Sequence, residues 1–135
     1  MGFRARKLRR GDTAAAAFVR SQGVRGTYVV NALAAGAADG WVFERDGAVT
    51  AVAWFGPRGN LVLVSSERRC GYEADVVEKV LASRYAWRIA LGDAELIDGL
   101  RARVGRPVLS HRDQIYYVGG RADVCAARDQ AEVRK

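Results

Sequence analysis

The stretch NLVLVSSERRCGYEADVVEKVL, residues 60–81, decides the fold of this chain. Its first part, Asn60–Val64, is apolar at consecutive positions, which predicts a central strand with both faces covered. A basic loop follows. In the last part, apolar residues recur at the spacing of one helix face; they are Val76, Val77, Val80 and Leu81.

Upstream of this stretch lies the clearest local signal in the chain, a β-hairpin. Trp41–Arg45 and Ala48–Phe55 are both typical of strands, and Asp46-Gly47 stands between them. An Asp-Gly pair between two apolar runs is the strongest short-range hairpin signal, because both residues tolerate positive φ. With Asn60–Val64 as the third strand, this region predicts an antiparallel meander.

The N-terminal part predicts an edge strand and two helices. Phe3–Leu8 alternates weakly between apolar and basic residues, which is typical of an edge strand. Gly11-Asp12-Thr13 supplies a turn and an N-cap for a helix over Ala14–Ser21, and Gly23 ends that helix because glycine tolerates positive φ. A second helix is predicted over Thr27–Ala35.

The C-terminal part predicts one more helix between two strands. Trp87–Leu91 is a short predicted strand, and Asp93 is the predicted N-cap of a helix that stops before Gly105. Val108–Val118 predicts a long closing strand. The polar residues 119–135 predict a tail or linker.

These elements predict the α+β class, in the order β-α-α-β-β-β-α-β-α-β. A meander followed by an alternating unit gives a mixed, mostly antiparallel sheet with helices on both faces. The chain has 135 residues, a length that suits one domain. We expect that domain over residues 1–118.

The formal net charge of +7 raises nucleic acid as a partner. However, arginine supplies nearly all of the 22 basic side chains, and most of them are scattered. The one cluster, residues 4–10, has no aromatic neighbour beyond Phe3 on which bases could stack. We therefore rank a nucleic-acid-binding module last, and note that the same charge would attract a polyanionic small ligand.

The cysteines and the hydropathy pattern bear on the compartment. Cys70 and Cys125 are far apart and lack metal-ligand spacing, so we expect reduced thiols in a cytoplasm. No apolar run approaches the roughly 18 residues of a membrane span, and no secretory apolar stretch follows the basic N-terminus. We expect a cytoplasmic protein without a membrane partner.

The sequence lacks the residues that several common kinds of active site and metal site require. The single histidine, His111, has no ligand-spaced partner for zinc, and no G-x-S-x-G elbow presents a serine to it. His111 and Asp113 share a strand face, which is more typical of a surface than of catalysis. There is no G-x-G-x-x-G and no P-loop. We expect no metal.

The loop after Asn60–Val64 is the remaining candidate site. Free N–H groups at a helix N-terminus bind anions together with the helix dipole, and Arg68 and Arg69 would add positive charge. Alternatively, Glu73 and Asp75 in the first turn balance the dipole, as in an ordinary helix start. The residues leave both alternatives open.

The order of elements resembles the GNAT superfamily of N-acetyltransferases over residues 3–118. Two short segments are similar to the N-terminal half of tandem bacterial members; they are Gly59-Asn60-Leu61 and Arg112-Asp113-Gln114-Ile115-Tyr116-Tyr117. Glu132-Val133-Arg134-Lys135 is similar to Arg4-Ala5-Arg6-Lys7, as if a second copy followed. The resemblance implies a second GNAT domain or a homodimer as partner.

The resemblance implies acetyl-CoA as the cofactor, in a splayed gap between the parallel strands Asn60–Val64 and Trp87–Leu91. Its pyrophosphate would lie on a loop with the pattern Q/R-x-x-G-x-G/A. If the pattern begins at Arg68, its last position is Glu73 instead of a small residue. If it begins at Arg69, its last position is the small Ala74, but Tyr72 stands where the pattern has glycine. The implied cofactor contacts are Val62, Val64, Arg68, Arg69, Cys70, Gly71, Tyr72 and Ala74.

The activity that the resemblance implies is acyl transfer to an amine of a small molecule or peptide. Tyr116 or Tyr117 would protonate the departing thiolate, and Glu67 and Glu44 are the candidate bases. Three alternatives stay open: an acyltransferase with a divergent loop, a non-catalytic half-domain that packs on or regulates a partner acyltransferase domain, and a basic nucleic-acid module. The second alternative, the non-catalytic half-domain, predicts that the gap between the two parallel strands is filled, for example by Tyr72.

Overall fold

Five strands form one sheet and lie in it in sequence order, β1-β2-β3-β4-β5. The computed structural model describes residues 2–66 and 73–105. Strands β1 to β4 are antiparallel neighbours, and β4 and β5 are parallel. The elements are β1 (Phe3–Lys7), α1 (Thr13–Ser21), the 3-10 helix η1 (Gly23–Gly26), α2 (Thr27–Ala34), β2 (Gly40–Arg45), β3 (Ala48–Phe55), β4 (Asn60–Ser65), α3 (Glu73–Ala82), β5 (Ile89–Leu91) and α4 (Ala94–Arg103).

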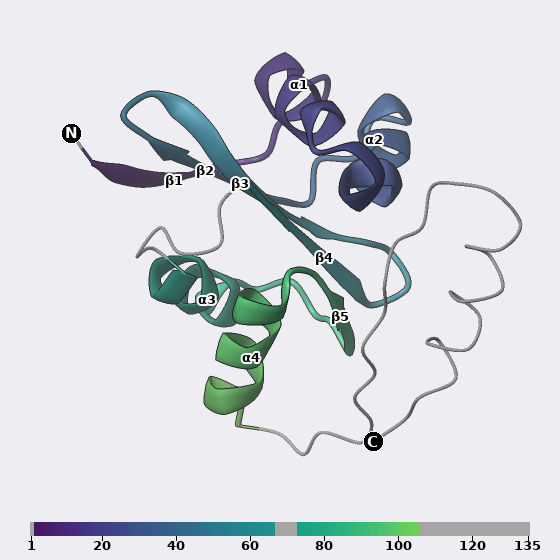
Figure 1. Ribbon diagram of the computed structural model, residues 1–135. Helices are drawn as coiled ribbons and strands as arrows, with labels where there is room; N and C mark the ends of the chain where they lie inside the picture. The colour runs from purple at the N-terminus through teal and green to yellow at the C-terminus, as the bar shows by residue number, and fades with distance from the viewer. Residues whose placement is uncertain (1, 67–72, 106–135) are drawn as a thin grey trace, which may run out of the picture. The chain divides into compact units, whose positions relative to one another are not determined.

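Helices cover both faces of the sheet. Figure 1 shows α1 and α2 on one face and α3 and α4 on the other. The predicted α+β class is thus confirmed, with a mixed sheet and four α-helices in the described part of the chain. All of these elements lie in one unit, Met1–Val104.

The β2–β3 hairpin turns where the sequence predicts it. Asp46 and Gly47 have φ angles of 54° and 86°, and positive φ at both central residues is the mark of a type I′ turn. A bulge between Phe43 and Glu44 interrupts the register with β3. The predicted meander is confirmed as β2, β3 and β4.

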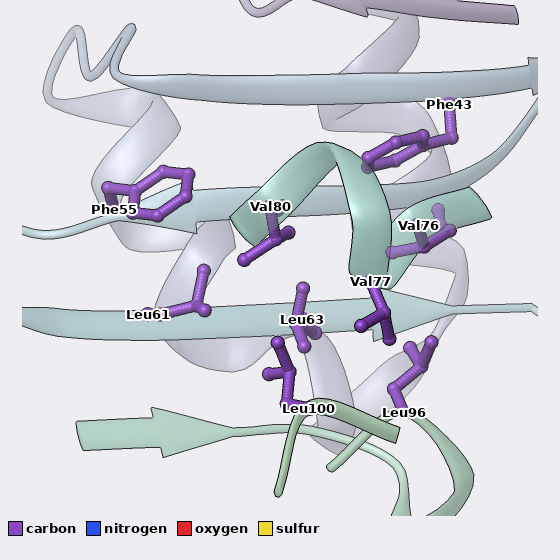
Figure 2. Close-up of a cluster of buried hydrophobic side chains, with 11 residues drawn as sticks. Phe43, Phe55, Leu61, Leu63, Val76, Val77, Val80, Leu96 and Leu100 are labelled. Atoms are coloured by element: carbon purple, nitrogen blue, oxygen red, sulfur yellow. The ribbon is translucent and has the colours of Figure 1, made fainter. Parts of the chain in front are cut away.

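β4 is the central strand that the LVLV run predicts, and it is buried on both faces. Leu61 and Leu63 pack with valines and leucines of α3 and α4, as Figure 2 shows. Val62 and Val64 belong to the opposite cluster, which includes residues of α1 and α2. Each of these four side chains is at most 4% exposed, so β4 ties the two layers of helices together.

The first two helices begin and end close to their predicted limits. Asp12 is the N-cap of α1, and its carboxylate accepts a hydrogen bond from the Ala15 amide at 3.1 Å. Gly23 has a φ of 65° after the end of α1, as a terminating glycine requires. α2 ends at Ala34, one residue before the predicted limit.

The second parallel strand is shorter than Trp87–Leu91, the predicted range. The amides of Arg88 and Ile89 both donate to the Gly59 carbonyl, at 2.8 and 3.1 Å. Two consecutive amides that converge on one carbonyl break the alternation of a strand, so β5 begins only at Ile89. Asp93 holds the predicted N-cap position of α4 but makes no side-chain capping hydrogen bond.

Two predicted segments lie outside the described residues, namely the closing strand Val108–Val118 and the tail 119–135. Within residues 2–66 and 73–105, no helix combines the length and the apolar character that crossing a membrane requires.

Candidate functional site

The candidate site is at the carboxyl end of β4, where β4 extends beyond its parallel partner. Their pairing runs from Asn60–Ile89 to Val62–Leu91 and stops there. β4 continues through Leu63, Val64 and Ser65, beyond the last paired residue of β5. We call the β5-facing backbone of residues 63–65 the β4 edge.

The hydrogen bonds to β3 fix which backbone groups face the β4 edge. Gly56 N donates to Asn60 O at 2.7 Å, and Ser66 N donates to Thr50 O at 3.0 Å. In an antiparallel pair, alternate residues point their polar groups at the partner strand. The even-numbered residues of β4 therefore face β3, and the backbone groups of Leu63 and Ser65 face the β4 edge.

Val62 and Val64, two predicted cofactor contacts, lie beside this edge. Their side chains are buried in the cluster that includes α1 and α2, and their backbone groups face β3 by the same alternation. The parallel pair Val62–Leu91 uses the Leu63 amide as its donor, so a hydrogen bond from β4 to a ligand on the β5 side would involve the Leu63 carbonyl or Ser65.

An arginine that the sequence analysis did not single out reaches this edge. Arg25 Nη2 donates to the Ser65 carbonyl at 3.0 Å and to Gln22 Oε1 at 2.6 Å. Arg25 Nη1 donates to Asp93 Oδ1 at 2.8 Å. One guanidinium from η1 thus joins the end of α1, the end of β4 and the start of α4.

Two glycines shape the segment that carries Arg25. Gly23 has a φ of 65°, a conformation that side chains disfavour. At Gly26 an added Cβ would lie 2.3 Å from the Val19 carbonyl oxygen, so η1 packs directly on the backbone of α1. The spacing Gly23-Val24-Arg25-Gly26 was the signal in the sequence: an arginine held in a short, glycine-bounded turn between two helices.

Asp93 is brought to the site by the turn between β5 and α4. A Cβ on Gly92 would lie 2.9 Å from Leu63 Cβ and 3.0 Å from Leu63 O, so this turn passes close against β4. Asp93 Oδ1 is bound to Arg25, whereas Oδ2 is buried and has no hydrogen-bond partner among the described residues. One oxygen of this carboxylate therefore makes no hydrogen bond within the described part of the chain.

Most of the other predicted site residues lie outside the described residues. These are Arg68, Arg69, Cys70, Gly71, Tyr72, Tyr116, Tyr117 and Glu67. Ala74 is described: it is exposed in the first turn of α3, and its carbonyl accepts a hydrogen bond from Arg103 Nη1 at 3.4 Å.

Glu44, a candidate base, is bound by two arginines. Arg4 Nη2 and Arg6 Nε donate to its two carboxylate oxygens at 2.7 and 2.9 Å. The hydrogen bond from Arg6, followed by that from Arg4, holds the pKa of Glu44 below its usual range. A carboxylate in this state accepts a proton poorly, so the geometry gives no support to Glu44 as a general base.

Among the described residues there is no group of three or more His, Cys, Asp or Glu side chains that could hold a metal ion. No protein-family model, curated protein or solved structure matches this chain. The geometry of the β4 edge and of the ion pair between Arg25 and Asp93 is therefore what bears on function.

Proposed function

We propose that this chain is a GNAT-like N-acyltransferase domain that uses acetyl-CoA to acylate an amine. The observation that carries the proposal is the β4 edge. β4 and β5 are the one parallel pair among the described strands, and β4 extends past β5 with backbone groups directed to that side. An extended ligand with amide groups can pair with such an edge as an added strand does.

The chemistry needs a donor for the thioester oxygen and a site for the phosphates. Backbone N–H groups that face a developing oxyanion stabilise it. The Ser65 amide is directed to the correct side, whereas the Leu63 amide serves the Val62–Leu91 pair. The segment that precedes α3 in the sequence, with Arg68, Arg69 and Gly71, is the proposed pyrophosphate site. In the proposed reaction the amine attacks the thioester carbonyl and loses a proton to Glu67, the remaining candidate base. The C–S bond then breaks, and Tyr116 or Tyr117 protonates the thiolate that leaves.

A second candidate function is a non-catalytic half-domain that packs on a partner acyltransferase domain. One observation favours it: Arg25 already occupies the Ser65 carbonyl at the β4 edge. An edge that an internal side chain fills permanently would not admit a cofactor. The two candidates therefore differ in whether Arg25 can leave.

The nucleic-acid alternative gains no support from the N-terminal arginines. Arg6 is bound by Asp12 and Glu44, and Arg4 by Glu44. Two of the side chains that would have to contact phosphates are thus neutralised within the fold.

Calorimetric titration of the full chain with acetyl-CoA tests the proposal. ATP is the matched control, because a chain of net charge +7 attracts any polyanion. The proposal expects saturable binding of acetyl-CoA that persists at a salt concentration where ATP no longer binds. Absence of acetyl-CoA binding at millimolar ligand contradicts it.

A further inference from the structure

We infer that Arg25 and Asp93 form a clasp that closes the β4 edge and opens when acyl-CoA binds. The inference rests on the proposed function, since it assigns a gate to the same site. It makes Arg25 an internal competitor of the ligand, although arginines near a cofactor phosphate usually assist binding.

The competition follows from one shared acceptor. The Ser65 carbonyl faces the β4 edge, and it accepts a hydrogen bond from Arg25 Nη2 at 3.0 Å. An amide N–H of a strand-like ligand would use this same carbonyl. A carbonyl oxygen can accept two hydrogen bonds, but a guanidinium 3.0 Å from this oxygen stands where a strand-like ligand would lie. The ligand therefore binds to the fraction of molecules in which Arg25 has left.

The contact between Arg25 and Asp93 is partly exposed and incompletely hydrogen-bonded, as expected of a contact that can break. The Arg25 side chain is 34% exposed and Asp93 17%. The ion pair uses one hydrogen bond to Asp93 rather than two, and it leaves Asp93 Oδ2 buried without a partner in the described chain. Arg25 itself sits on a single turn of 3-10 helix, which is less stable than an α-helix.

Asp93 also has a second role available when Arg25 leaves. It holds the N-cap position of α4, with extended backbone angles, yet its side chain makes no capping hydrogen bond. An aspartate at this position normally accepts from an amide in the first helical turn, as Asp12 accepts from Ala15 in α1. The carboxylate can therefore exchange Arg25 for the backbone of α4, which gives the clasp two defined states.

The first test is acetyl-CoA titration of Arg25→Gln, with Arg20→Gln as its control. Both variants lose one positive charge, and Arg20 is an exposed residue of α1 with no part in the clasp. Opening the clasp removes the competitor, so we expect Arg25→Gln to bind on the order of tenfold more tightly than the wild type. Arg20→Gln is expected to bind as the wild type does or slightly more weakly. Equal or weaker binding by Arg25→Gln, relative to Arg20→Gln, overturns the clasp.

A second variant keeps the arginine and guards against loss of folding. Asp93→Asn removes the charge that holds Arg25 but retains an oxygen that can cap α4, and we expect it to bind more tightly than the wild type too. If the wild type binds acetyl-CoA and neither variant binds more tightly, the clasp is wrong and the proposed function stands. If neither the wild type nor either variant binds, the proposed function fails and the clasp fails with it.

Discussion

Within residues 2–66 and 73–105, two arginine–aspartate pairs have an aspartate that is the N-cap residue of a helix, and the two pairs are built differently. Arg6 binds both oxygens of Asp12, at 2.7 and 3.1 Å, with side chains 15% and 1% exposed. Arg25 binds one oxygen of Asp93 at 2.8 Å. The first carboxylate also caps its helix, whereas the second does not.

This difference indicates that the Arg6–Asp12 pair is a fixed contact, whereas the Arg25–Asp93 pair can rearrange. Asp12 accepts from Arg6, from the Arg9 amide and from the Ala15 amide, so every part of the carboxylate is used. Asp93 has one satisfied oxygen and one buried oxygen without a partner in the described chain. A fully bonded buried group resists rearrangement, while a partly bonded one has something to gain from it.

We expect the largest loss of stability from removing the Asp12 carboxylate, which binds Arg6 and caps α1. Asp12→Ala takes away the cap of α1 and leaves the half-buried Arg6 with Glu44 alone, so we expect a loss of about 3 kcal/mol in the free energy of unfolding. Asp12→Asn keeps an oxygen for the cap and is expected to lose less. Urea denaturation measures both variants. A smaller loss for Asp12→Ala than for Asp93→Ala would reverse the comparison.

The charged carboxylate of Asp12 should also make the stability of the fold depend on pH in the acid range. The hydrogen bonds from Arg6, supported by the Ala15 and Arg9 amides, lower the pKa of Asp12 from 3.8 to about 2, against the opposing effect of burial. A carboxyl group with a lowered folded pKa stabilises the fold above its unfolded pKa and ceases to do so as the pH falls through the folded value.

The wild type should therefore lose about 2 kcal/mol more stability between pH 5 and pH 2 than Asp12→Asn, which has no carboxyl group at this position. Urea denaturation at a series of pH values provides the measurement. Parallel acid profiles for the two proteins would show that Asp12 is not held in its charged form.

The placement of Arg25 depends on Gly26. An added Cβ would lie 2.3 Å from the Val19 carbonyl oxygen, and backbone there cannot move without displacing η1. We expect Gly26→Ala to cost about 2 kcal/mol of unfolding free energy. Gly2→Ala is the control, because a Cβ at Gly2 meets nothing within 4 Å. Thermal unfolding that is the same for both variants would contradict the close packing of η1 on α1.

The smallest effect is expected at the clasp. Asp93→Ala removes a single, partly exposed ion pair and no capping hydrogen bond, so its cost should stay below about 1 kcal/mol. The same urea titration compares it with Asp12→Ala. A cost as large as that of Asp12→Ala would mean that Asp93 makes a second fixed contact, and the clasp would lose its physical basis.

Local signals in the sequence were enough to predict much of the fold. The Asp46-Gly47 turn, the LVLV run of β4 and the N-cap position of Asp12 each depend on neighbouring residues, and all three are confirmed. β5 was predicted too long because its start is decided by the Gly59 carbonyl, a partner distant in the sequence.

The candidate site was harder to predict because its contacts are long-range. Gly11-Asp12 and Gly92-Asp93 both precede a helix and look alike in the sequence. Only the fold brings Arg25 to Asp93, across 68 residues, and this contact replaces the cap that the local rule predicts. The resemblance to acyltransferases implies a site at the end of β4, but it does not imply the contact of Arg25 with the Ser65 carbonyl there.

The most direct test is to observe the two arginines while acetyl-CoA is added. Side-chain NMR of the isotope-labelled full chain, with Arg25→Gln and an Arg6 substitution to assign the signals, follows each guanidinium separately. We expect the Arg25 signal to shift or broaden as acetyl-CoA binds, while the Arg6 signal stays unchanged. Binding of acetyl-CoA that leaves the Arg25 signal unchanged would contradict the claim that Arg25 closes the site.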